Sequence, residues 1–96
     1  MSDEFEVTDA TDSRRFELRR AGDLVGFASY HRRDHAVVVT HVETLAQHRG
    51  QGYASRLMAG IVGMLRRDGH TIVPLCRFAA NYLRERPEDA DVVHGA

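Results

Sequence analysis

The fold is decided by the stretch Arg49-Gly50-Gln51-Gly52-Tyr53-Ala54, at which the period of the hydrophobic pattern changes. Before it, residues 35–45 are rich in β-branched residues and apolar on both alternating faces, which predicts a central strand. After it, apolar residues recur three and four positions apart and predict an amphipathic helix: Ala54, Leu57, Met58, Ile61, Met64 and Leu65. The stretch therefore joins a central strand to the first turn of a helix.

Further strands are expected upstream of this junction. Residues 16–30 have the pattern of a hairpin whose turn is Ala21-Gly22-Asp23. A second turn at Arg32-Arg33-Asp34 leads into the central strand. Residues 5–8 predict another short strand, and residues 9–15 predict a loop.

Downstream of the junction the pattern predicts one more strand and one more helix. Gly69 ends the first helix, and residues 71–73 form a short buried strand that Pro74 closes. A second helix, at about residues 76–85, is expected to present four side chains to the core: Phe78, Ala79, Tyr82 and Leu83. The order of elements predicts an α/β (α+β) domain with a mainly antiparallel central sheet of about five strands and two helices.

The composition is that of one small domain. Its 96 residues, 43% of them hydrophobic, suffice for one core but not for two. We expect a single domain over residues 1–96, with a core at about 5–88 and a flexible acidic tail. The net charge of -1 provides no positive field for nucleic acid or an anionic membrane, so neither is expected as a partner. One cysteine, an acidic N-terminus and short apolar runs predict a cytoplasmic protein without a membrane span.

The glycine-rich turn has two interpretations. A strand that ends in Gly-x-Gly before a helix gathers free N–H groups and the positive end of the helix dipole around one point, which suits phosphate oxygens. Gly50 and Gly52 leave room for a ligand, Arg49 adds positive charge, and the small Ala54 allows close approach. An ordinary turn with glycines for geometry is equally compatible. The lysine of a P-loop and the third glycine of a dinucleotide fingerprint are missing, which excludes those two classes of site.

Three residues are candidates for chemistry: Cys76, His41 and Glu43. Cys76 lies where the last strand turns into the second helix, and a helix N-terminus favours the reactive thiolate; a buried inert thiol is the alternative. His41 and Glu43 are two apart on a strand and so share a face. Neighbouring valines would bury the His41 ring and favour a neutral form that accepts a proton, unless it is an ordinary core histidine. A neutral His41 could act as a base.

Three short motifs follow one another along the chain: Thr40-His41-Val42-Glu43, Arg49-x-x-Gly52-x-Ala54 and Pro74-Leu75-Cys76. Together they resemble the short single-domain members of the GNAT superfamily of acetyl-CoA-dependent acetyltransferases, whose signature is Arg/Gln-x-x-Gly-x-Gly/Ala. The resemblance implies a minimal GNAT-like fold with acetyl-CoA as the cofactor. It also implies that the central strand pairs with pantetheine and that the loop binds the pyrophosphate, through Val42, Glu43, Thr44, Arg49, Gly50, Gln51, Gly52, Tyr53, Ala54 and Ser55.

The resemblance further implies acetyl transfer from acetyl-CoA to an unidentified acceptor, an amine in this family, with Cys76 either carrying the acetyl group or holding the cofactor end. Because many members use a strand glutamate to deprotonate the amine, it makes Glu43 a base that competes with His41, and it ranks the candidates Cys76, His41, Glu43. Two departures favour a weakly catalytic acyl-CoA-binding or regulatory module instead. Leu83 stands where larger members carry the tyrosine that protonates the leaving thiolate, and the final two strands of the acceptor wall are absent. A module for some other phosphorylated ligand is a third reading. No histidine has ligand spacing with an Asp, Glu or Cys, so no metal is predicted; the oligomeric state stays open.

Overall fold

The computed structural model describes residues 4–95 and contains one five-stranded sheet, two α-helices and three short 3-10 helices within them. The elements in chain order are β1 (Phe5–Ala10), η1 (Thr11–Ser13), β2 (Arg15–Arg20), β3 (Asp23–Arg33), β4 (Ala36–Thr44), η2 (Ala46–His48), α1 (Tyr53–Asp68), β5 (Thr71–Pro74), α2 (Arg77–Arg84) and η3 (Pro87–Val92). The expected α+β class and the two expected α-helices are confirmed.

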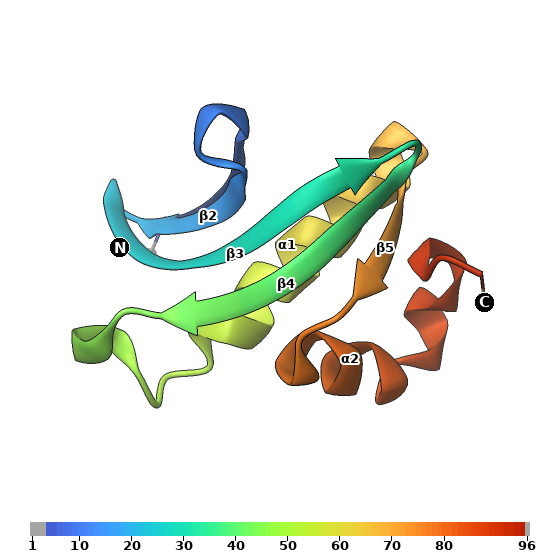
Figure 1. Ribbon diagram of the computed structural model, residues 1–96. Coiled ribbons are helices and arrows are strands. Elements are labelled where there is room, and N and C mark those ends of the chain that lie inside the picture. The colour runs from blue at the N-terminus through green and yellow to red at the C-terminus, as the bar shows by residue number, and fades with distance from the viewer. Residues whose placement is uncertain (1–3, 96) are drawn as a thin grey trace.

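The strands lie in the sheet in chain order, β1-β2-β3-β4-β5 (Figure 1). The first three pairings are antiparallel, as expected for strands joined by short turns. The last is parallel, because α1 carries the chain back along β4 before β5 begins. The sheet is therefore mixed, which corrects the expectation of a mainly antiparallel sheet at this edge.

The two predicted turns have different outcomes. Ala21 and Gly22 both have positive φ, 49° and 89°, as a two-residue hairpin turn requires, so the first turn is confirmed. The second was expected at residues 32–34, but β3 extends to Arg33 and the chain reverses at Asp34, whose φ is 57°. Aspartate tolerates this left-handed conformation better than most residues, which explains why the turn lies there.

Helix α1 covers one face of the sheet and lies behind β3 and β4 in Figure 1. It ends at Gly69, whose φ of 74° lets its N–H reach the carbonyl of Leu65, as predicted for this glycine. The core between helix and sheet includes these fully buried side chains: Phe16, Leu18, Val25, Val37, Val39, Leu57, Met58, Ile61, Ile72 and Val92. Ala79, Tyr82 and Leu83 of α2 join the core, whereas Phe78 is 39% exposed, so the prediction for Phe78 is wrong.

The core extends beyond the limit expected at about residue 88. Val92 of η3 is 2% exposed, and the N–H of His94 donates to the carbonyl of Ile72 at 2.9 Å. On the surface, the Arg66 guanidinium of α1 holds Asp89 at 3.0 Å and Asp91 at 2.7 Å. Residues 87–94 are thus fastened to β5 and α1, and the expected core was too short at this end.

None of the helices formed by residues 4–95 is long and apolar enough to cross a bilayer. The cytoplasmic location stays a prediction.

The two glycines inside α1 differ in their surroundings. A Cβ at Gly60 would lie 2.3 Å from Val7 Cγ2 and 2.8 Å from Val7 Cβ, so the helix touches β1 there through its backbone. A Cβ at Gly63 would meet nothing within 4 Å. Close packing against the sheet therefore explains Gly60 but not Gly63.

Replacing each glycine with alanine should move stability in opposite directions. Gly63→Ala should raise the free energy of unfolding by up to about 1 kcal/mol, the usual helix preference for alanine over glycine. Gly60→Ala has the same helical gain but should lower the free energy of unfolding, because displacing a stiff valine typically costs about 1–3 kcal/mol. Urea denaturation of both variants measures the difference. Equal effects at the two positions would show that α1 does not press on β1.

Candidate functional site

A β-bulge divides β4 into two halves. Ser29 pairs with His41 and Tyr30 with Val39, so Thr40 is an extra residue that β3 does not match. On the other side of β4, the pairing with β5 runs only from Ala36 to Val39. The carbonyl of Val39 accepts one further hydrogen bond, from the N–H of Leu75 at 2.9 Å. Ladder pairing with β5 therefore stops just where the bulge begins.

The second half of β4 leaves a backbone edge open toward α2. Among residues 4–95, no strand pairs with Val42, Glu43 or Thr44 on that side. The Val42 side chain packs against the core, and the carbonyl of Thr44 accepts a hydrogen bond from Arg49 Nε at 3.3 Å. An extended ligand with amide groups could pair with this edge as an additional strand does.

The open edge leads into the glycine-rich loop. Gly50 and Gly52 have φ values of 80° and 76°, and a Cβ at either would meet nothing within 4 Å. Gly52 is the N-cap of α1 and offers no side-chain acceptor, so the first N–H groups of the helix, at Tyr53, Ala54 and Ser55, have no side-chain cap. The backbone conformation alone accounts for the two glycines. The space above them and the uncapped N–H groups also make a site for an anion.

Two members of the expected binding set hold the loop in place. Tyr53 is buried, and its hydroxyl accepts a hydrogen bond from Arg20 Nη1 at 2.7 Å and donates to Gln51 Oε1 at 3.2 Å. The Phe5 ring lies edge-on to Tyr53 at 5.3 Å and carries the Arg56 guanidinium on its face at 4.0 Å. The side chains of Gln51 and Tyr53 therefore support the loop, while the first helical turn bears a positive charge.

Neither Arg20 nor Arg56 was among the residues predicted from the sequence for this site. The position of Arg56, one turn after the N-cap, was a usable signal. Arg20 reaches the loop only through the pairing of β1, β2 and α1, which the sequence does not specify.

His41 and Glu43 form a dyad on the sheet face opposite α1. His41 Nε2 lies 2.9 Å from Glu43 Oε1, and the two side chains are 57% and 39% exposed. Their shared face is therefore confirmed, but the expected burial of the His41 ring by valines is wrong, because the bulge at Thr40 turns the ring to solvent. Phe27 stands opposite Glu43 in β3, with its ring 6.2 Å from the imidazole.

The same face carries a polar network on β2 that the sequence did not reveal. Glu17 is buried beneath two arginines and accepts hydrogen bonds from Arg15 at 2.8 Å and Arg19 at 2.9 Å. The hydrogen bond from Arg15 is the main reason that the pKa of Glu17 lies below its ordinary value, although burial opposes the shift. Arg15 also lies over the Phe27 ring at 4.5 Å, which connects the network to the dyad.

Cys76 lies at the N-terminus of α2, as predicted, but does not join the dyad. Its Sγ accepts a hydrogen bond from the N–H of Ala79 at 3.4 Å, and the side chain packs partly against the core. Within the described residues, no hydrogen bond connects this thiol with His41 or Glu43. The structure thus brings together two of the three candidates and gives the third a capping role.

The described part of the chain contains no group of three His, Cys, Asp or Glu side chains that could hold a metal ion.

Comparisons with known proteins give a family and a fold. A family model described as GCN5-related N-acetyl-transferase matches residues 15–92. A GCN5-like protein from Staphylococcus aureus, solved by NMR, superposes with a TM-score of 0.71 at 21% identity and covers 100% of this chain and 93% of its own. At that identity the likeness concerns the fold alone. No curated protein sequence matches the chain significantly.

Two further solved structures resemble the chain less closely. Diaminobutyrate acetyltransferase from Paenibacillus lautus has a TM-score of 0.44 at 27% identity, over 54% of this chain and 33% of its own. Nourseothricin acetyltransferase has a TM-score of 0.45 at 23% identity, over 86% and 66%. Both likenesses are too weak to add to the first.

The capping role of Cys76 predicts a pattern of stability changes. Cys76→Ser retains an acceptor for the Ala79 N–H and should leave the free energy of unfolding unchanged or higher, because serine is a favoured N-cap. Cys76→Ala leaves the N–H without its partner and should lower the free energy by about 1 kcal/mol or less. Urea denaturation compares the two variants. If alanine is as stable as serine, the thiol contributes nothing as a cap.

Proposed function

The chain belongs to the GCN5-related N-acetyltransferase family, and on that premise we propose that acetyl-CoA binds along the open half of β4 and gives its acetyl group to an amine at the His41–Glu43 dyad. Enzymes of this family use acetyl-CoA as the donor.

The main support for the proposal is that the open backbone edge of β4 leads directly into the glycine-rich loop. Coenzyme A has amide groups in its pantetheine arm and a pyrophosphate at the far end of that arm. The edge of Val42, Glu43 and Thr44 suits the amides, because unpaired strand groups need hydrogen-bond partners. The uncapped N–H groups after Gly52, with the nearby charges of Arg49 and Arg56, suit the pyrophosphate. One extended molecule can satisfy both.

The acetyl transfer itself needs a base, and the dyad is our choice. The amine nitrogen attacks the thioester carbon, the new C–N bond forms as the C–S bond breaks, and the amine proton passes to His41 or Glu43. A backbone N–H of β4 that points to the thioester oxygen would stabilise the negative charge formed there. The dyad faces solvent on the side of the sheet away from α1, so the acceptor approaches from that side.

A second route would pass the acetyl group through Cys76. The thiolate would attack the thioester, release coenzyme A and then give the acetyl group to the amine. The hydrogen bond that Sγ accepts from Ala79 places the thiol at the helix N-terminus, but no hydrogen bond connects it with either base in the described residues. We therefore propose direct transfer as the main route and acetyl-Cys76 as the alternative.

One observation favours a second function, an acyl-CoA-binding module with little turnover. Leu83 takes the position at which larger relatives carry a thiolate-protonating tyrosine, and it is buried. The neighbouring Tyr82 is also buried, and burial raises the pKa of its hydroxyl. Leucine has no proton to give and the buried Tyr82 hydroxyl is a weaker acid than usual, so neither residue suits protonation of the leaving thiolate. Tight coenzyme A binding without thioester loss across a panel of amines would favour this function over an enzyme.

Cofactor binding can be tested at the loop with a matched control. Gly52 and Gly69 have nearly equal φ values, 76° and 74°, at opposite ends of α1, so alanine at either should cost about 1–2 kcal/mol of stability. Only Gly52→Ala should also weaken acetyl-CoA binding, measured by calorimetry on the folded variant. Thermal-shift measurements with acetyl-CoA, coenzyme A and nucleotides identify the ligand. If nucleotides stabilise the protein and coenzyme A does not, the cofactor assignment fails.

The roles of the three candidates separate in acetyl-transfer assays. Glu43→Gln and His41→Gln should slow transfer by about a hundredfold with unchanged acetyl-CoA binding, whereas His35→Gln, in the turn before β4, should not. Cys76→Ser should keep most of the activity if transfer is direct. With labelled acetyl-CoA, a protein adduct in the wild type that disappears in Cys76→Ser, together with lost activity, would instead support the route through the thiol.

A further inference from the structure

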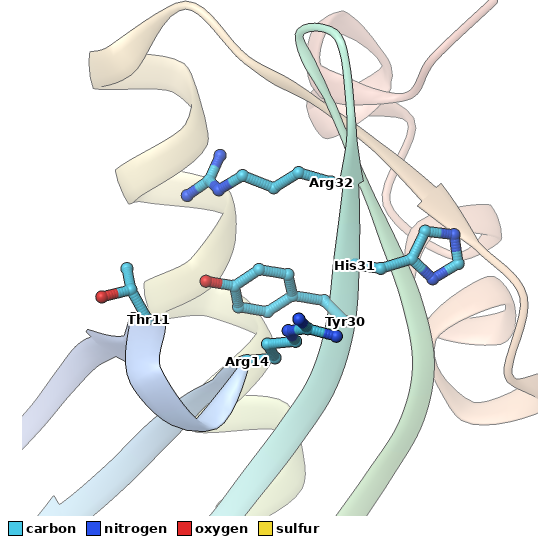
Figure 2. Close-up of a pocket in the computed structure, with 5 residues that line it drawn as sticks. All are labelled: Thr11, Arg14, Tyr30, His31 and Arg32. Atoms are coloured by element: carbon cyan, nitrogen blue, oxygen red, sulfur yellow. The ribbon is translucent and has the colours of Figure 1, made fainter.

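A cavity lies between η1 and β3, away from the glycine-rich loop. Its volume is about 380 Å³, within the usual range of small-molecule sites, and it is lined by Thr11, Arg14, Tyr30, His31 and Arg32 (Figure 2). Figure 2 shows the Tyr30 hydroxyl directed toward Thr11, with Arg14 below the ring and Arg32 above it in this view, whereas the His31 ring points to the other side of β3. Two guanidinium groups and a threonine hydroxyl thus surround one aromatic ring.

Among residues 4–95, the only carboxylate hydrogen-bonded to these lining residues already has a cationic partner. Asp9 accepts hydrogen bonds from the Tyr30 hydroxyl and from Arg32 Nη2, the latter at 2.8 Å. Asp12, next to Thr11, is exposed and does not line the cavity. Of the two arginines that line the cavity, Arg14 therefore has no carboxylate partner among the lining residues. Arg32 keeps N–H donors that Asp9 does not use.

Arg14 supplies that charge from an unusual backbone position. Its φ of 53° and ψ of 48° are left-handed, a conformation that costs an arginine about 1 kcal/mol relative to glycine. Its N–H donates to Thr11 and its carbonyl accepts from the N–H of Tyr30, so the backbone is held beside the cavity. No hydrogen bond or ion pair within the described residues engages its guanidinium. Five donors are therefore available at the cavity.

We propose that this cavity binds a small molecule that carries an oxyanion, a carboxylate or a phosphate, on an apolar body. Arg14 and the free donors of Arg32 bind the oxygens, because guanidinium groups bind such anions through paired hydrogen bonds. The Thr11 hydroxyl donates a further bond. The apolar body packs against the small part of Tyr30 that stays exposed, since Phe16 and the Arg32 guanidinium lie against the rest of its ring. The volume exceeds what a free inorganic anion fills, which favours a larger ligand.

The site is distinct from the proposed acetyl-CoA site. Tyr30 pairs with Val39, and the loop leaves β4 after Thr44, so the two lie roughly 15 Å or more apart along the strand. Tyr30 and Arg32 share a sheet face with Val39 and Val37, which α1 covers, while the dyad lies on the opposite face. Occupancy of the cavity should therefore leave the coenzyme A loop accessible.

NMR titration of the amide signals tests the proposal, with inorganic phosphate, phenyl phosphate and benzoate as probes. We expect saturable shifts at residues 11–14 and 30–32 with benzoate or phenyl phosphate, and weaker binding of inorganic phosphate, which lacks the apolar body. If benzoate binds more tightly than phenyl phosphate, the natural ligand carries a carboxylate, and the reverse order indicates a phosphate. Shifts confined to residues 49–54, or no saturable shifts at residues 11–14 and 30–32, would overturn the proposal and leave the acetyl-CoA assignment untouched.

Two variants and a control separate binding from folding. Arg14→Asn removes the charge, and asparagine tolerates the left-handed backbone, so the fold should persist while binding weakens about tenfold or more. Thr11→Val removes the hydroxyl at an exposed position and should weaken binding less. Arg33→Gln removes an equal charge next to Arg32, outside the cavity lining, and should leave binding unchanged. Equal weakening by Arg14→Asn and Arg33→Gln would mean attraction to general positive charge rather than a site.

Discussion

One extra residue in β4 determines how this small sheet can hold a ligand. Thr40 bulges from the ladder with β3, and the pairing with β5 stops at Val39 and Pro74. A bulge bends its strand and increases its twist, so the second half of β4 leaves the direction that β5 follows. Among the described residues, the backbone groups of Val42 to Thr44 therefore have no strand partner on the side of β5. Without that divergence, β5 could continue the ladder and close the edge.

The neighbouring strand has to accommodate the bent half of β4. Gly26 of β3 lies so close that a Cβ on it would come within 2.9 Å of the Glu43 carbonyl oxygen, an approach that real side chains do not make. The N–H of Leu45 then donates to the carbonyl of Val25, one residue earlier in β3. The position of the Glu43 backbone thus depends on a missing side chain in another strand. From sequence alone, Gly26 is only a glycine inside a predicted strand.

Most of the fold could be predicted from local sequence patterns. The rest depends on contacts between residues that are far apart in the sequence. The period change at Gly50, the turn at Gly22 and the helix end at Gly69 each reflect a rule that acts within a few residues, and the structure confirms them. The exposed ring of His41 could not be foreseen, because its neighbours in sequence are valines and only the bulge turns it outward. The packing of the C-terminal segment also depends on a distant contact. Its composition is acidic, which predicts an exposed tail, but Val92 packs in the core beside β5.

The face of the sheet opposite α1 has a chemical consequence for the proposed function. No helix crosses β2 and β3 on that face in Figure 1. Charged side chains of β2 and the Phe27 ring of β3 lie there instead. Glu17 is buried only because Arg15 and Arg19 lie over it, and Arg15 in turn lies on Phe27. If the acceptor reacts at His41 and Glu43, it meets this charged and aromatic surface rather than an enclosed pocket. Selection of the acceptor would then rest on a few exposed side chains, which bind weakly in water, so a broad acceptor range is the physical expectation for the chain acting by itself.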